Sequence, residues 1–155
     1  MKQIDRLLFE YGDSHQNSFN KKVHWICVPL IMFSLFGLLT SIPFSNKTLL
    51  MSHSTWVLGL ALLYYLRLSF SMFIGFLVIG GAMVLGNWEL YQYLGQSNGS
   101  MALISILIFA IAWAGQFYGH KVEGKKPSFL KDLQFLLIGP AWLLHFIYKR
   151  IGIPY

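Results

Sequence analysis

The chain has 155 residues, of which 55% are hydrophobic and only 12% are charged. Soluble domains carry about 25% charged residues, so this composition excludes an ordinary soluble surface and indicates a membrane protein. The formal net charge of +6 does not indicate nucleic-acid binding, because the Lys and Arg residues flank apolar segments and form no stripe with base-stacking aromatic residues.

The first 24 residues are charged and amphipathic. Their apolar residues recur at helical spacing and predict a short helix lying on the membrane surface, with a stripe made of Ile4, Leu7, Leu8 and Tyr11. The apolar run that follows has no small-residue cleavage site near its end, so we do not interpret it as a removed signal peptide.

Four apolar stretches follow, and each is close to the roughly 20 residues that a helix needs to cross a bilayer. We expect crossings at residues 25–44, 50–66, 69–93 and 101–119, with a tight bend near Arg67 and Ser69. A fifth apolar run, Leu133 to Tyr148, is short and contains Pro140, so we expect a helix broken at the proline that is re-entrant or interfacial. The sequence thus predicts an all-α, multi-pass transmembrane helical bundle that forms one integral membrane domain over residues 1–155.

The basic residues predict the orientation of this bundle, because Lys and Arg collect on the cytoplasmic side of a membrane. With four crossings, nine of them lie on one side and Lys47 lies alone on the other. A re-entrant fifth segment adds Lys149 and Arg150 to the larger group. We therefore expect a cytoplasmic N-terminus, in the inner membrane of a bacterium or in the endoplasmic reticulum of a eukaryote.

This orientation collects several histidines near one membrane face. His15, His24, His120 and, with a re-entrant fifth segment, His145 all lie there, whereas His53 lies at the other end. Neutral imidazoles without a pair of thiolates suit Fe(II), Zn or Cu, and the sequence does not choose among these metals. No H-x-x-H or H-x-x-x-H pair occurs, which favours one metal ion or none. The alternative interpretation is that the histidines are amphipathic anchors at the membrane interface.

A shared ligand for His15 and His24 requires a bend in the chain. The two residues are nine apart, so one continuous helix would point their rings to opposite sides. The Asn and Ser residues between them favour a turn, and we expect Asn20 to cap a helix that starts near Lys21.

The last predicted crossing carries a second group of polar residues around His120. Gln116 shares a helix face with His120, and Glu123 follows about one turn later, so an amide or a carboxylate could hold the second ring nitrogen of His120. Gly115 and Gly119 form a Gly-x-x-x-Gly pattern, which predicts that this helix packs closely on a neighbour. Trp113, seven residues before His120, is expected to face a cavity on the same side.

Two blocks of the chain, YGDSHQNSFNKKVHWICVPLI and QFYGHKVEGKKPSFLKDLQFLLIGP, resemble the Mpo-like 2-hydroxy fatty acid dioxygenases, which are small multi-pass membrane proteins. The matching positions are Tyr11, His15, Asn20, His24, Val28, Pro29, Gln116, Phe117, Gly119, His120, Glu123, Lys125, Pro127 and Pro140. The region of Glu123 is one residue shorter than in the fungal proteins, and His145 has no counterpart in the pattern. The fourth metal ligand therefore stays open.

The resemblance implies Fe(II)-dependent α-oxidation, in which O2 and a 2-hydroxy fatty acid give the acid one carbon shorter. It implies that His15, His24 and His120 hold the iron and carry the catalysis, with His145 as the candidate fourth ligand. The supporting residues would be Gln116, Glu123 and Asn20, and the residues that steer the substrate carboxylate would be Lys121, Lys125 and Arg67. The expected partners are the substrate, O2 and membrane lipid, without nucleic acid. A non-enzymatic membrane carrier or scaffold is the alternative function.

Overall fold

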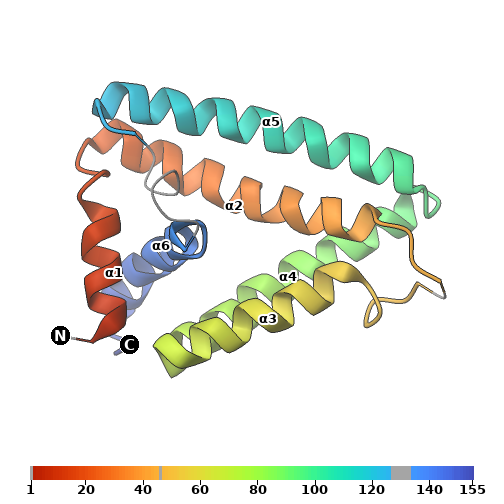
Figure 1. Cartoon of the computed structure of the whole chain (residues 1–155), viewed down its shortest axis with the longest axis horizontal. Coiled ribbons are helices and arrows are strands. Elements are labelled where there is room, and N and C mark those ends of the chain that lie inside the picture. Colours follow the sequence, from red (N-terminus) through yellow and green to blue (C-terminus); the bar gives the residue numbers. More distant parts are fainter. Residues whose placement is uncertain (1, 46, 127–133) are drawn as a thin grey trace.

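The computed structural model describes residues 2–45, 47–126 and 134–155, which form six helices and no strand (Figure 1). Their bounds are α1 Gln3–Gly12, α2 Ser18–Ser41, α3 His53–Leu68, α4 Phe70–Tyr93, α5 Asn98–Glu123 and α6 Phe135–Ile151. The all-α prediction is confirmed. Pro127 of the family pattern and Leu133, the first residue of the fifth apolar run, lie outside the described residues.

Three of the helices found in the described ranges, α2, α4 and α5, are long and apolar enough to cross a membrane. The helix α3 matches the second predicted crossing but has only 16 residues, which span about 24 Å against a hydrocarbon core of about 30 Å. It ends early because Ser69 has extended backbone, with φ −167° and ψ 131°. The Ser69 side chain also caps α4 by accepting from Met72 N, so one residue forms the predicted tight bend.

The long helices form two pairs that diverge from one end of the molecule. In Figure 1, α2 and α5 lie side by side along their length, and α3 and α4 form the second pair. The pairs meet where α2 contacts α4, at the end that carries the loop after α2. At the opposite end, α1 packs on α6 near both chain termini. The helix α6 contacts both α2 and α4, so it lies between the diverging pairs at this end.

The N-terminal helix has the predicted amphipathic character, and its apolar stripe is buried inside the protein. Ile4, Leu7, Leu8 and Tyr11 are all buried in the core cluster that includes α6 residues such as Trp142. The apolar face of α1 thus packs on α6, which leaves its charged face outward.

The predicted break at Pro140 is wrong, because α6 runs continuously from Phe135 to Ile151. Pro140 is the sixth residue of the helix and removes one backbone N–H donor from it. Its neighbours Ile138, Ala141 and Trp142 are buried in the core cluster, and this packing holds the helix together.

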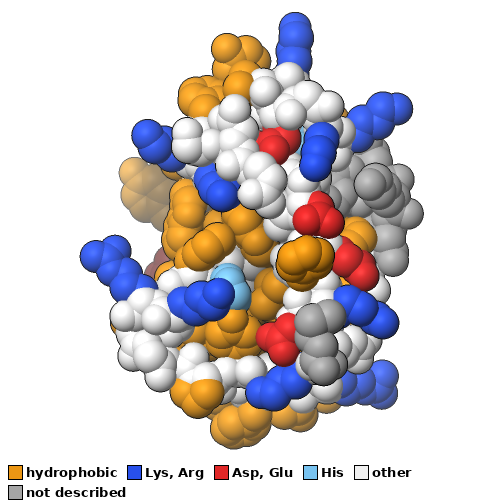
Figure 2. All heavy atoms as spheres, turned by 90° about the vertical axis from the view of Figure 1, so that its left-hand side faces the viewer, with side chains coloured by type: hydrophobic (Ala, Val, Ile, Leu, Met, Phe, Trp, Pro, Cys, Tyr) orange, Lys and Arg blue, Asp and Glu red, His pale blue; other side chains and the backbone are white. Residues whose placement is uncertain are grey.

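Basic side chains gather at the end of the molecule where α1, the start of α2 and the end of α5 lie. Figure 2 shows this face, with Lys and Arg side chains around its rim and hydrophobic side chains between them. Lys47 lies apart from them, where its Nζ is 2.8 Å from Asn98 Oδ1 and 3.9 Å from the centre of the Tyr91 ring. The charge asymmetry expected from the sequence is thus present in the fold, and the cytoplasmic placement of this face stays a prediction.

The predicted close packing of the glycine pattern is confirmed between α5 and α2. A Cβ atom built on Gly115 would lie 2.7 Å from Cys27 Sγ, and one built on Gly119 would lie 2.5 Å from Asn20 Oδ1. Real Cβ atoms do not approach so closely, so the two helices are in contact at a distance that only glycine permits.

We predict that Gly119→Ala lowers the free energy of unfolding by about 1–3 kcal/mol, because the added methyl group forces α2 and α5 apart. Unfolding of the purified protein in detergent by a denaturant would measure this change. Gly81→Ala is the matched control, since nothing lies within 4 Å of a Cβ atom at Gly81, and alanine favours a helix there by about 1 kcal/mol. Equal stability of the two variants would contradict the prediction.

Candidate metal centre

Three histidines from separate parts of the chain meet at the basic end of the molecule. His15 follows α1, His24 lies in the second turn of α2, and His120 lies in the last turn of α5. A ring nitrogen of each lies within 4.8 Å of the others, and all three side chains are buried. The structure therefore brings together three of the four histidines expected near one membrane face.

The bend predicted between His15 and His24 is present, with a different capping residue. Asn17 caps α2, because its backbone is extended and its side chain accepts a hydrogen bond from Phe19 N at 2.8 Å. Asn20, which was expected to cap a helix near Lys21, lies inside the first turns of α2. The helix thus starts three residues earlier than expected, at Ser18.

Glu123 holds this bend from the end of α5. One carboxylate oxygen accepts from Gln16 N at 2.8 Å, and the other accepts from Asn17 N at 2.9 Å and from Asn20 Nδ2 at 3.1 Å. Hydrogen bonds to a charged carboxylate are about twice as strong as neutral ones. Glu123 therefore fixes the segment that carries His15 against the helix that carries His120.

Backbone carbonyl groups set the protonation pattern of two of the rings. Nδ1 of His15 lies 2.6 Å from Tyr11 O, and Nδ1 of His24 lies 2.9 Å from Asn20 O. A carbonyl oxygen only accepts, so each Nδ1 carries the hydrogen and each Nε2 of the neutral ring presents a lone pair. These two Nε2 atoms face each other at 2.8 Å. Two lone pairs at that distance repel each other unless a cation lies against both.

His120 supplies the third ring of the cluster. Its centre lies 4.9 Å from that of His15 and 5.1 Å from that of His24. Its Nδ1 is buried and has no hydrogen-bond partner among the described residues, so neither Gln116 nor Glu123 holds that nitrogen. Two facing lone pairs on His15 and His24, with an unpartnered nitrogen on the neighbouring His120, fit a bound transition-metal ion, which takes neutral imidazole as a ligand.

Burial keeps the first of these rings in the form that binds a metal. It lowers the pKa of His15 to about 4, so the ring is neutral near pH 7. Two aromatic side chains bury the His15 ring: Tyr11 stacks on it with ring centres 4.2 Å apart, and the centre of the Trp142 ring lies 5.2 Å from it. No sequence pattern predicts Trp142 at this position, whereas the four-residue spacing from Tyr11 to His15 does indicate that these two side chains are neighbours.

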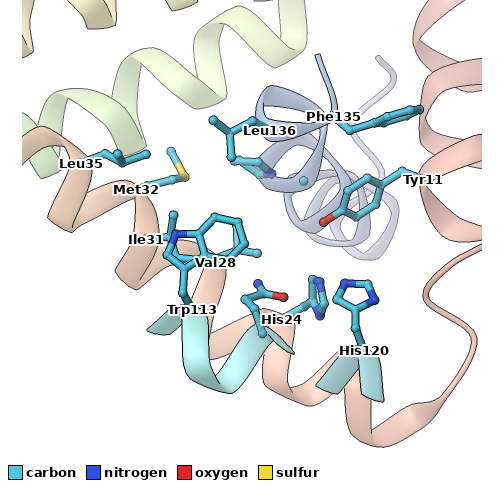
Figure 3. Close-up of a pocket in the computed structure, with 13 residues that line it drawn as sticks. Tyr11, His24, Val28, Ile31, Met32, Leu35, Trp113, His120, Phe135 and Leu136 are labelled. Carbon is cyan, nitrogen blue, oxygen red and sulfur yellow. The ribbon is translucent and has the colours of Figure 1, made fainter. Parts of the chain in front are cut away.

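A small apolar cavity of about 60 Å³ adjoins His24 and His120. Trp113 and Gln116 line it, so Trp113 faces a cavity as expected. Figure 3 shows the Tyr11 hydroxyl pointing toward the same two histidines. Burial raises the pKa of Tyr11, so this hydroxyl keeps its proton and can donate a hydrogen bond to a bound molecule.

The remaining candidate residues lie outside the cluster. His145, the candidate fourth ligand, lies in α6, where its Nδ1 has a hydrogen bond with the Tyr155 hydroxyl, and it is absent from the metal-holding group found in the described part of the chain. Lys121 and Lys125 line an open groove beside His120, and Lys125 Nζ donates to Asp13 O at 2.6 Å. Arg67 is exposed near the end of α3.

The fold and this site define a class: an all-helical protein with membrane-length apolar helices and a buried three-histidine cluster that could hold a metal ion. Within that class, the chain belongs to the family described as 2-hydroxy-palmitic acid dioxygenase Mpo1-like, whose model matches residues 1–151. The family suspected from the two sequence blocks is thereby confirmed. No curated protein and no solved structure matches the chain.

Proposed function

We propose that the chain is an Fe(II)-dependent dioxygenase of the membrane that converts 2-hydroxy fatty acids to acids one carbon shorter. The observation that carries this proposal is the pair of facing Nε2 atoms on His15 and His24, 2.8 Å apart beside the buried His120. The family description, which names 2-hydroxy-palmitic acid and a dioxygenase, supports the substrate class and the reaction.

His15, His24 and His120 would hold the metal and leave further coordination positions open. Bound Fe(II) would supply the activation of O2 and an electrophilic contact for the hydroxyl and carboxylate groups of the substrate. Overall, the 2-hydroxy acid and one O2 give the shortened acid, CO2 and water. The bond between the first two carbons of the substrate breaks, and both carbons are oxidised as O2 is reduced.

The protein side chains around the rings have separate tasks in this proposal. The carbonyl groups of Tyr11 and Asn20 fix the ring nitrogens that face inward, and the aromatic rings of Tyr11 and Trp142 keep bulk water away. Lys121 and Lys125 stand in the groove beside His120, where their charge attracts the substrate carboxylate. We place this basic face of the molecule in the cytoplasm.

We predict that the purified protein loaded with Fe(II) consumes O2 in the presence of 2-hydroxy-palmitic acid and forms the acid one carbon shorter. An oxygen electrode and mass spectrometry of the products would measure the two quantities. Palmitic acid is the matched control, since without the 2-hydroxyl group it should give neither signal. Absence of O2 uptake with every 2-hydroxy acyl chain would contradict the proposal and favour a non-enzymatic carrier or scaffold.

A further inference from the structure

A second and larger cavity lies between the two helix pairs and is apolar throughout. Its volume is about 500 Å³, and its walls come from α2, α3, α4 and α6. Among the described residues that line it, Tyr65 alone has a polar side-chain atom, and its hydroxyl already donates to Leu137 O at 2.7 Å. A volume of about 300–1,000 Å³ is typical of sites for small molecules, and these walls offer no partner to a polar ligand.

This cavity adjoins the small one beside the histidines. Met32, Leu35, Leu136 and Pro140 line both cavities, so the two cavities adjoin at these side chains and together mark one apolar path. Figure 3 shows Met32, Leu35 and Leu136 on the side of the small cavity away from His120. A molecule with its head at the histidines could therefore extend an apolar tail between the helix pairs.

The length of the path suits the acyl chain of a membrane lipid. From His24 to Leu39, α2 rises by about 22 Å, at about 1.5 Å per residue. One leaflet of a bilayer gives an acyl chain about 15 Å, half of the hydrocarbon core. An extended chain that fills a leaflet thus fits along the cavity wall formed by α2.

Small residues line the inner part of the cavity beside Leu58. Ala61 of α3 lines it, and so does Gly80 of α4, where a Cβ atom would lie 2.5 Å from Leu58 Cδ1. Because α3 begins after the loop that follows α2 and runs back toward the end that carries the histidines (Figure 1), Leu58 lies farther from the histidines than Tyr65 does. Leu58 therefore borders the end of the path that a long chain reaches last.

We propose that this cavity binds the acyl chain of the substrate, and that Ala61 and Leu58 set the longest chain accepted. The inference rests on the proposed function for the identity of the head group, which the histidines would bind. The occupant is a linear hydrocarbon chain, since the walls are apolar and Met32 and Leu136 lie where the two cavities adjoin.

Chain-length profiles of variants test the proposal. The full chain in lipid nanodiscs would be assayed with 2-hydroxy acids of increasing length. Ala61→Trp should lower kcat/KM for long chains relative to short ones by about tenfold or more, a factor that one methylene group is worth in an apolar pocket. Leu58→Ala should extend the profile toward longer chains. The matched control is Leu60→Trp, because Leu60 is 68% exposed on the outer side of α3, and its profile should stay unchanged. A profile that is also unchanged in Ala61→Trp and Leu58→Ala would overturn the proposal.

A photoreactive 2-hydroxy acid with a diazirine at the end of its chain gives a readout that needs no turnover. Irradiation should label residues at the inner end of the cavity, such as Leu39 and Leu58, and Ala61→Trp should abolish that label while Leu60→Trp keeps it. Labels confined to the outward residues Leu60 and Leu63 would overturn the proposal that this cavity binds the acyl chain. If no 2-hydroxy acid is turned over, the proposed function fails, and this labelling pattern still decides whether the cavity binds an acyl chain.

Discussion

Alanine in place of His15, His24 or His120 is expected to remove the bound metal and to lower turnover of 2-hydroxy acids by more than about 100-fold. Loss of a residue that only supports a ligand typically costs about 10–100-fold in affinity or activity, and each of these rings would be a ligand itself. Their nitrogens lie within 4.8 Å of one another, so removal of one ring leaves two donors and an incomplete site. Metal content of the purified variants, measured by mass spectrometry, and O2 uptake would give the two results.

Two other histidines provide matched controls for this experiment. His53 begins α3, away from the cluster, and His145 pairs with Tyr155. We expect His53→Ala and His145→Ala to retain the metal. Loss of metal in His145→Ala would instead identify it as the fourth ligand. Full metal content in all three cluster variants would contradict the metal centre and support interfacial anchoring of a carrier or scaffold.

Glu123→Gln is expected to weaken metal binding by about 10–100-fold and to lower the free energy of unfolding by about 1–3 kcal/mol. The carboxylate accepts three hydrogen bonds, from Gln16 N, Asn17 N and Asn20 Nδ2. Glutamine keeps the size of the side chain, but it replaces one of the two carboxylate oxygens with an NH2 group, which cannot accept a hydrogen bond from these donors. The turn that carries His15 would then lose part of its attachment to α5.

Competition with a coloured chelator would measure the metal affinity of this variant, and denaturant unfolding would measure its stability. Glu10→Gln is the matched control, because Glu10 is exposed and its ion pair with Arg6 is long, at 3.9 Å, so little change is expected. Unaltered metal affinity in Glu123→Gln would show that the turn keeps His15 in place without the carboxylate.

The sequence predicted the helices well because each depends on a local pattern. Long uncharged runs predicted α2, α4 and α5, and the helical spacing of apolar residues near the N-terminus predicted α1. Local reasoning failed where packing decides. Pro140 stays inside a helix because its neighbours are buried, and Asn17 caps α2 because its own backbone is extended, which the composition of the Asn and Ser segment did not reveal.

The three histidines of the candidate metal centre could be predicted from the sequence, but the contacts that hold them in place could not. Charge asymmetry placed His15, His24 and His120 on one side of the membrane, and the structure brings these three together. The sequence also placed His145 there, but the packing of α6 turns it toward Tyr155. The contact of Glu123 with the turn after α1 joins residues about a hundred positions apart, and no helical spacing reveals a pairing of that kind.

The divergence of the two helix pairs bears on how such a protein would meet its substrate. On the proposed function, the cavity would receive its substrate from the surrounding lipid, because two of the helices that line it, α2 and α4, are long enough to cross a membrane. The quantity that governs occupancy is then the mole fraction of the hydroxy acid in the bilayer, whatever its solubility. Comparisons of substrates of different length would need to be made at equal fractions in the lipid, since a longer chain also partitions more completely into the membrane.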